Sequence, residues 1–279
     1  MAKKKINQSR TKAAQTGTRF LLDNAPIQPA LKFRIEEAYK TIRANIMFSI
    51  MKKGCKRIIV SSSMPNEGKT TTTVNLAVSI SQADQRVLLI DGDLRKPKIH
   101  HYFSVPNSPG LTNYLSSVIS GRGSTDLFGV IRPTEYKNLC ILSSGSIPPN
   151  PAELLGSELM SEFLDEVSRD FDYIIIDTPP VNVVSDALPL IRESDGVVLV
   201  VRSNHSSHPE LQKALSALEF IDAKILGFVV NHVETKSNRM YSSGGYGGYK
   251  YGYSAYGGYS YKSGRGLRYK SNTPYDPRS

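Results

Sequence analysis

The segment with the clearest chemical potential is 61–70, Ser-Ser-Ser-Met-Pro-Asn-Glu-Gly-Lys-Thr, which lies between an apolar run and an amphipathic one. Its last three residues, Gly68, Lys69 and Thr70, have the order found in a phosphate-binding loop. In such a loop the glycine lets backbone N–H groups approach phosphate oxygens. The lysine contacts the β- and γ-phosphates, and the hydroxyl ligates magnesium. Because Gly-Lys-Thr alone is a short motif, the start of an ordinary helix is the alternative interpretation.

Two acidic motifs follow two other apolar runs. Val-Leu-Leu-Ile precedes Asp91-Gly-Asp93-Leu-Arg95, and Tyr-Ile-Ile-Ile precedes Asp177. Ligands of open α/β sheets bind outside the carboxyl ends of the strands, and a carboxylate that ends a buried strand is costly unless it faces a positive charge. An exposed turn is the alternative for Asp91-Gly-Asp93. Three such motifs in order, each after an apolar run, predict nucleotide binding, with Asp177 beside the phosphate loop holding a magnesium-bound water.

The elements that must position these residues alternate along the chain. Apolar residues at three- and four-residue spacing predict a helix over roughly 33–52, with Gly54 as its stop. Short β-branched runs then predict buried strands, and longer amphipathic stretches predict helices between several of them. The predicted strands are 57–61, 87–90, 139–142, 173–176, 197–201 and 225–230, and the predicted later helices are 69–83, 152–169 and 208–221. This alternation predicts an α/β fold of the P-loop NTPase type, a mostly parallel sheet with helices on both faces. The irregular segment 104–138 has no clear assignment.

Charge and composition separate a core from two basic ends. The 279 residues carry a net charge of +10; residues 1–20 hold six Lys/Arg and no acid, and residues 241–279 hold six Lys/Arg against one aspartate. The latter segment also holds ten of the fifteen tyrosines and nine glycines, with almost no aliphatic residues, so it cannot build a core of its own. We predict a basic flexible N-terminal segment (1–32), a nucleotide-binding domain (33–236) and a disordered Tyr/Gly-rich tail (237–279).

Other sequence features exclude several classes of protein. The sequence contains no apolar run long enough for a transmembrane helix and no apolar stretch after the lysine-rich start, so neither a membrane span nor a secretory signal is expected. Cys55 and Cys140 are too few for a disulfide framework or a zinc site, which favours a reducing cytosol.

Taken together, the motifs resemble those of a known family. The phosphate loop and the two acidic motifs resemble the Walker A, Walker A′ and Walker B motifs of the bacterial tyrosine kinases, the cytoplasmic type associated with capsule and exopolysaccharide synthesis. Glu37-Ala-Tyr-Lys40-Thr-Ile-Arg43 is similar to the Glu-x-x-Arg-x-x-Arg oligomerisation motif of that family. The segment 147–155, Ile-Pro-Pro-Asn-Pro-Ala-Glu-Leu-Leu, and the terminal tyrosines add to the resemblance, which covers about residues 33–275.

Two positions depart from the family pattern. Lys40 stands where the family commonly has arginine, and a lysine lacks the bidentate geometry of a guanidinium group, which puts ring assembly in doubt. Ser63 stands where the family has a small residue, usually alanine or glycine, but serine is itself small enough for nucleotide binding to survive.

The resemblance implies an ATP- and Mg²⁺-dependent protein-tyrosine kinase. It implies that Lys69 and Thr70 bind phosphate and magnesium, and that Asp93 and Asp177 support the metal. Asp91 is the candidate base, although the division of roles between Asp91 and Asp93 stays open. Arg95 would contact the incoming substrate or phosphate. Asn231 resembles an adenine-reading position, with a strand-end turn as the alternative. The residues expected to bind the nucleotide are Pro65, Asn66, Glu67, Gly68, Lys69, Thr70, Thr71 and Asn231.

The tail supplies the expected phosphoacceptors. A glycine-rich tail of this length has a root-mean-square span of roughly 31–37 Å, enough to reach the site of a neighbouring subunit. We therefore expect autophosphorylation in trans. The expected acceptors are Tyr246, Tyr249, Tyr251, Tyr253, Tyr256, Tyr259 and Tyr261.

The resemblance also implies partners. A separate transmembrane adaptor of the polysaccharide chain-length type would activate the kinase with its cytoplasmic end, and a cognate phosphotyrosine phosphatase would reverse the reaction. A homo-oligomeric ring would form through Glu37, Lys40 and Arg43. No nucleic acid is expected as a partner. The chain would be cytoplasmic and recruited by its adaptor to the inner face of the membrane.

Three alternative interpretations compete with the kinase. A partition or septum-site ATPase of the same superfamily carries a signature lysine five residues before the loop lysine, where this chain has Met64, and has no need of terminal tyrosines. A nucleic-acid or polyanion-binding protein would use the basic aromatic tail but leave the ATP site without a role. The tyrosines could also belong to a low-complexity tail with no chemistry.

Overall fold

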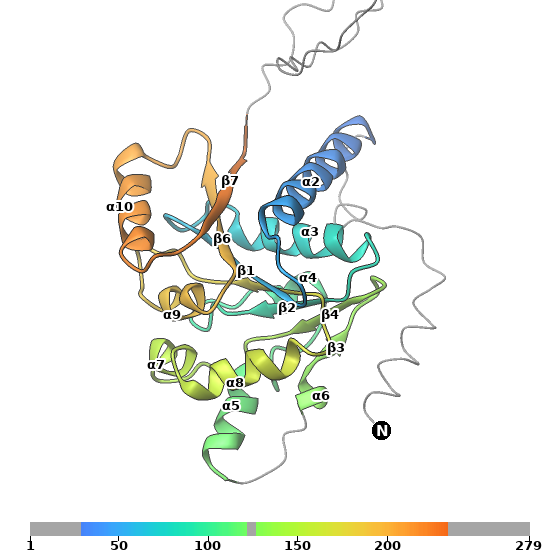
Figure 1. The fold of residues 1–279 in the computed structure, drawn as a ribbon, viewed down its shortest axis with the longest axis vertical. Coiled ribbons are helices and arrows are strands. Elements are labelled where there is room, and N and C mark those ends of the chain that lie inside the picture. Colours follow the sequence, from blue (N-terminus) through green and yellow to red (C-terminus); the bar gives the residue numbers. More distant parts are fainter. Residues whose placement is uncertain (1–28, 122–126, 234–279) are drawn as a thin grey trace, which may run out of the picture. The chain divides into compact units, whose positions relative to one another are not determined.

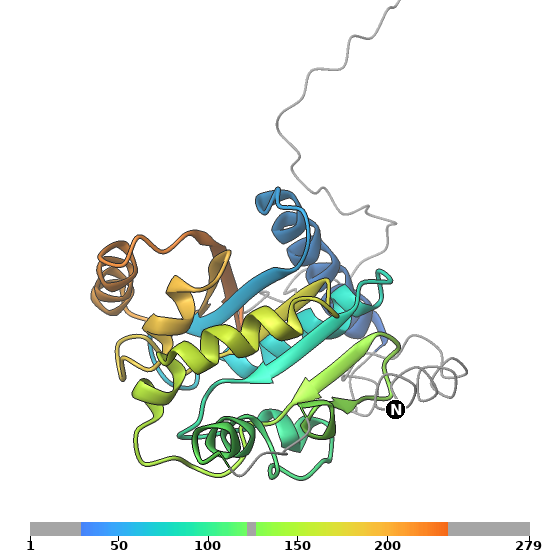
Figure 2. The ribbon, with the colours of Figure 1, turned by 60° about the horizontal axis from the view of Figure 1, so that its bottom comes forward.

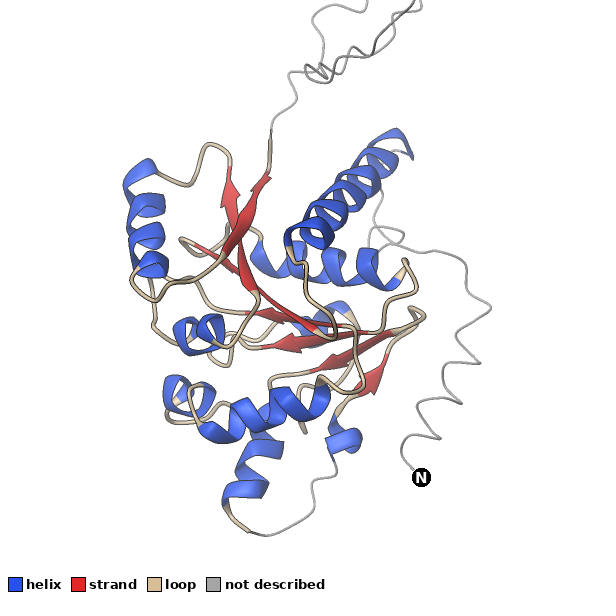
Figure 3. Cartoon of the chain, viewed as in Figure 1, coloured by secondary structure: helices blue, strands red, loops and turns tan. Residues whose placement is uncertain are grey.

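The computed structural model describes residues 29–121 and 127–233. These residues form a seven-stranded sheet in the order β3-β4-β2-β5-β1-β6-β7, with helices on both sides (Figures 1 and 3). All neighbouring strands are parallel except β3 and β4. The strands are β1 (Lys56–Ser62), β2 (Val87–Asp91), β3 (Arg132–Pro133), β4 (Leu139–Leu142), β5 (Tyr173–Asp177), β6 (Gly196–Arg202) and β7 (Ile225–Asn231). The predicted fold class is confirmed.

The helices form two layers. On one face lie α2 (Pro29–Ser49), α3 (Lys69–Ser81) and α4 (Ile99–Tyr102). The other face is covered by α5 (Leu111–Ile119), α6 (Leu127–Val130), α7 (Pro151–Leu155), α8 (Glu158–Val167), α9 (Ala187–Arg192) and α10 (His208–Glu219). Figure 2 brings α8 and its neighbours on this second face forward.

Both faces of the central strands are buried because alternate side chains enter different cores. In β1, Ile59 packs with the helices of the second face, whereas Ile58 and Val60 pack with α2 and α3. In β5, Ile174 and Ile175 divide in the same way. This two-sided burial explains why the strands appear in the sequence as continuous apolar runs rather than as alternating ones.

Two helix boundaries differ from the prediction. The first described helix begins at Pro29 and ends at Ser49, so the predicted boundary between the N-terminal segment and the domain falls inside it. Proline is well suited to the first turn, where its missing N–H would have no helical partner. The helix expected over 152–169 is two helices, α7 and α8. The first ends at Leu155 with Gly156 as its C-cap, and Ser157 caps the second by accepting a hydrogen bond from the N–H of Met160.

The segment that had no assignment, 104–138, contains α5, α6 and the short antiparallel strand β3, with 122–126 outside the described residues. None of the helices in the described ranges is both long and apolar enough to cross a membrane. The predictions for residues 1–28 and for the tail lie outside the described residues.

Candidate active site

The three sequence motifs meet at one edge of the sheet. Strand β5 lies between β2 and β1, and the register pairs Asp177 with Asp91 on one side and with Val60 on the other. Because parallel strands end at the same edge, the phosphate loop after β1 and the acidic turn after β2 flank Asp177. The strand order therefore brings together residues that are more than a hundred positions apart.

Gly68 closes the phosphate loop at a position that only glycine fits. It precedes α3 with a φ of 94°, in the left-handed region that side chains disfavour. A Cβ atom added there would lie 1.9 Å from Nδ2 of Asn231. Asn231, at the end of β7, donates a hydrogen bond of 3.1 Å from this Nδ2 to the backbone oxygen of Glu67. In the structure Asn231 thus supports the loop backbone and does not line the cavity.

The side chain of Glu67 supports the phosphate loop from inside. Its carboxylate is fully buried and accepts hydrogen bonds from the hydroxyl of Ser63 (2.9 and 3.1 Å), the N–H of Met64 (2.9 Å) and the hydroxyl of Ser206. The side chain is turned away from the cavity. Ser63, the departure from the family pattern, supplies a donor to this carboxylate that alanine or glycine would lack.

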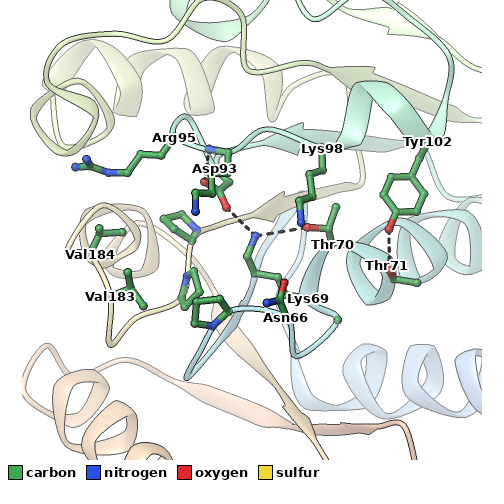
Figure 4. Close-up of a pocket in the computed structure, with 15 residues that line it drawn as sticks. Asn66, Lys69, Thr70, Thr71, Asp93, Arg95, Lys98, Tyr102, Val183 and Val184 are labelled. Carbon is green, nitrogen blue, oxygen red and sulfur yellow. Dashed lines mark hydrogen bonds and ion pairs between the residues drawn. The ribbon is translucent and has the colours of Figure 1, made fainter. Parts of the chain in front are cut away.

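Lys69 connects the loop to two of the acidic residues (Figure 4). Its ammonium donates to Oδ2 of Asp93 at 2.9 Å and to Oδ2 of Asp177 at 3.3 Å. The hydroxyl of Thr70 donates to the same oxygen of Asp177 at 2.6 Å, and that of Thr73 donates to Oδ1 at 3.0 Å. A cation, two carboxylates and two hydroxyls therefore share one small volume.

Burial shifts the proton affinities of this cluster. Burial alone would lower the pKa of Lys69, but the attraction of Asp177 and Asp93 outweighs it and the pKa is raised. Burial raises the pKa of Asp177, with Lys69 and the hydroxyls of Thr70 and Thr73 opposing the rise. The ammonium of Lys69 thus stays charged beside its carboxylates.

Asp91 holds the backbone of the loop that follows it. Its Oδ2 accepts hydrogen bonds from the N–H groups of Lys98 and Ile99, both 2.9 Å, and its Oδ1 accepts one of 3.3 Å from the N–H of Asp93. Burial, with the charge of Asp177 second, raises its pKa to about 7. Asp91 is fully buried and does not line the cavity, and its carboxylate is held by three backbone N–H groups.

Arg95 is held by a residue that the sequence analysis missed. Its guanidinium donates to both carboxylate oxygens of Asp186, at 2.6 and 3.1 Å. Asp186 is only 1% exposed and immediately precedes α9. It belongs to no motif and follows no strand directly, so the only local signal was an acidic residue at the start of a helix. A second missed contact is the 2.7 Å hydrogen bond between the hydroxyls of Thr71 and Tyr102.

These groups surround a cavity of about 440 Å³. Its lining includes eight of the residues predicted for the site: Pro65, Asn66, Gly68, Lys69, Thr70, Thr71, Asp93 and Arg95. The lining residues that were not predicted are Lys96, Lys98, Tyr102, Pro179, Pro180, Val183 and Val184. Residues of the loop after β1, among them Asn66 and Lys69, form one wall of the cavity, and Asp93 and Lys98 lie on the other (Figure 4).

The predicted oligomerisation motif lies on α2, and its residues differ in their contacts. Glu37 and Lys40 form an ion pair of 2.6 Å, with each side chain about half exposed. Arg43 instead donates to the backbone oxygen of Ser79 in α3, at 2.5 Å. Two of the three residues therefore face outward. The predicted phosphoacceptor tyrosines lie outside the described part of the chain.

The fold and the site define a P-loop nucleotide-binding protein, and the family described as an AAA domain matches residues 55–227. The tyrosine-protein kinase YwqD of Bacillus subtilis is 41% identical over 205 residues, covering 74% of this chain and 84% of YwqD. The kinase domain of the Escherichia coli tyrosine kinase ETK superposes with a TM-score of 0.68 and 31% identity, covering 81% of this chain and 84% of that structure. The chain belongs to the bacterial tyrosine kinases.

A septum-site protein is also similar in structure, but less so. The septum site-determining protein MinD of Pyrococcus horikoshii, solved with Mg-ADP, has a TM-score of 0.52 and 25% identity, covering 63% of this chain and 70% of that one. Both identity and coverage are lower than for the kinase domain. The comparisons therefore favour the tyrosine kinase over the septum-site ATPase.

Proposed function

We propose that this tyrosine kinase transfers the γ-phosphoryl group of ATP to tyrosines in the C-terminal segment of a neighbouring subunit, and so regulates capsule or exopolysaccharide synthesis. The observation that carries the proposal is the cavity in which Lys69, Thr70 and Asp93 converge, in a chain of this family. The acceptors are the tyrosines between positions 246 and 261.

The residues of the site fit a magnesium nucleotide. Thr70, Asp93 and Asp177 provide a hydroxyl and two carboxylates, the hard oxygen ligands that Mg²⁺ prefers. Lys69 already places a cation between the two carboxylates, which marks a position suited to positive charge. When bound, Mg²⁺ supplies charge that stabilises the phosphoryl group during transfer. The septum-site neighbour, solved with Mg-ADP, supports the same choice of ligand.

The residues that act on the tyrosine follow from the cavity lining. A phenol with a pKa near 10 is a weak nucleophile at neutral pH, so its hydroxyl must be positioned and must lose its proton as the bond to phosphorus forms. Asp93 lines the cavity and Asp91 does not, so we assign the acceptance of the phenolic proton to Asp93 and the support of the loop to Asp91, with ADP as the leaving group. We infer that Arg95, whose guanidinium pairs with Asp186, contacts the incoming substrate or a phosphate.

We propose partners on the same basis. A transmembrane adaptor would activate the kinase from its cytoplasmic end and recruit it to the inner face of the membrane, and a phosphotyrosine phosphatase would reverse the modification. Glu37 and Lys40 are exposed on α2 and available to a neighbouring copy in a ring. Each phosphotyrosine adds about −1.5 to −2 of charge to the basic tail, and the resulting repulsion between subunits would favour disassembly of the ring.

A mixing experiment tests transfer between subunits. One full-length variant carries Lys69→Met and keeps its tyrosines. The other keeps Lys69 but has phenylalanine at all ten tyrosines of residues 241–279. With Mg-ATP and the activating adaptor fragment, phosphotyrosine should appear on the Lys69→Met chain only in the mixture. Phosphate found by mass spectrometry only outside 241–275 in the unmodified protein would refute the proposed acceptors.

A further inference from the structure

Lys98 is a positive charge in the cavity with no fixed counterion. Four basic residues line the cavity: Lys69, Arg95, Lys96 and Lys98. Lys69 is paired with two carboxylates, and Arg95 is paired with Asp186. Within the ranges that the structure describes, the ammonium groups of Lys96 and Lys98 have neither an ion-pair nor a hydrogen-bond partner. Figure 4 shows its side chain pointing from the loop after β2 toward the region of Lys69 and Thr70, whereas Arg95 points away from them.

The fold fixes the backbone from which this side chain extends. The N–H of Lys98 and that of Ile99 both donate to Oδ2 of Asp91, and the side chain of Ile99 is completely buried. The preceding turn is held in the same way, because the N–H of Lys96 donates to Oδ1 of Asp93 at 3.0 Å. The exposed side chain of Lys98 therefore extends from a loop whose backbone is held by hydrogen bonds to Asp91 and Asp93, opposite the phosphate loop.

We propose that Lys98 is a second phosphate-binding lysine, which contacts the polyphosphate of ATP from the wall opposite Lys69. This proposal rests on the ATP site of the proposed function. The two substrates of the kinase differ in charge, and this difference indicates which of them Lys98 contacts. The tail has six Lys/Arg against one aspartate, so an ammonium in the cavity repels the acceptor segment, whereas the polyphosphate of ATP is strongly anionic. The ammonium of Lys69 is shared with Asp93 and Asp177, and Lys98 adds attraction that these carboxylates do not offset.

Nucleotide binding to three full-length variants tests the proposal. Lys98→Met keeps the length of the side chain and removes its charge, Lys98→Arg keeps the charge, and Lys137→Met is the control. Lys137 pairs with Asp84 near the amino end of β4, at the opposite edge of the sheet, so its loss changes the net charge equally without touching the cavity. Isothermal titration would measure the Kd of Mg-ATP, Mg-ADP and adenosine for each variant, and thermal unfolding would check that each is folded.

The expected result is a loss of affinity confined to phosphorylated ligands. A hydrogen bond to a charged group is worth roughly 10- to 100-fold in affinity. Lys98→Met should therefore weaken the binding of Mg-ATP by at least about tenfold and leave the binding of adenosine unchanged. Lys98→Arg should stay within about threefold of the unmodified protein. An unchanged Kd for Mg-ATP in folded Lys98→Met, or an equal loss in Lys137→Met, would overturn the proposal. Failure of the unmodified protein to bind Mg-ATP would instead refute the proposed function.

Discussion

Replacing Asp91 by asparagine tests whether this residue is a buried support of its loop. Burial raises its pKa from 3.8 to about 7. The folded protein therefore holds this proton more tightly than the unfolded chain does. The contribution of this group to the free energy of unfolding is fully present below pH 3.8, the pKa in the unfolded chain. It is lost as the pH rises from there through about 7, the pKa in the folded protein. Between pH 5 and pH 8 the free energy of unfolding should fall by about 2–3 kcal/mol on account of Asp91 alone.

Asparagine removes this pH dependence while keeping the main contacts. Its amide oxygen can accept the same two hydrogen bonds from the N–H groups of Lys98 and Ile99. Its amide nitrogen faces the N–H of Asp93, so the hydrogen bond from this N–H is lost. The loss lowers the free energy of unfolding by the same amount at every pH. The free energy of unfolding of the variant, relative to that of the unmodified protein, should therefore rise by about 2–3 kcal/mol from pH 5 to pH 8.

Urea unfolding followed by circular dichroism, at constant ionic strength, measures both proteins at the two pH values. If the free energies of unfolding of the two proteins differed by the same amount at pH 5 and at pH 8, the pKa of Asp91 would not be raised by burial. Kinase activity provides an independent check, because a supporting residue should tolerate asparagine better than Asp93 does. Complete loss of phosphotransfer in Asp91→Asn, with Mg-ATP binding intact, would refute the supporting role and restore Asp91 as the base.

Two further predictions concern the phosphate loop. Glu67→Ala leaves the buried donors of Ser63, Met64 and Ser206 without their acceptor, so the free energy of unfolding should fall by about 2–4 kcal/mol, and Glu67→Gln should cost less than half as much. Equal costs for the two variants in urea unfolding would contradict this account. Gly68→Ala should weaken Mg-ATP binding at least about tenfold, because the new methyl group collides with Asn231 and the left-handed backbone adds about 1–2 kcal/mol of strain. Adding Asn231→Ala should restore part of the affinity in a titration, and no recovery would show that the collision is not the cause.

The sequence predicted the parts of the site that depend on neighbouring residues. Lys69 was found because it belongs to the contiguous motif Gly-Lys-Thr. Asp93 and Asp177 were found because they follow apolar runs, and a strand and the polar residues after it are close together in the chain. The alternation of strands and helices predicted the parallel sheet for the same reason. The break at Gly156 and Ser157 was missed, because both flanking segments have the same helical pattern and only the cap separates them.

The sequence could not show whether a polar side chain faces the cavity or the interior of the loop. Glu67 and Asp91 stand inside motifs whose neighbours face the cavity, yet both carboxylates turn inward to backbone and hydroxyl donors. Asp186 and Lys98 belong to no motif and reach the site from separate loops.

The sequence by itself thus determined the chemistry that is available: a phosphate loop, carboxylates at strand ends and a basic, tyrosine-rich tail. Only the tertiary structure decided which groups face the cavity, because the order β2-β5-β1 that joins the three motifs arises from contacts between residues far apart in the chain. The same packing buries some carboxylates against donors and leaves others exposed to a ligand. The same type of side chain occurs in both settings, buried against donors or facing the cavity. Its surroundings alone determine whether it supports the loop or is available to a ligand.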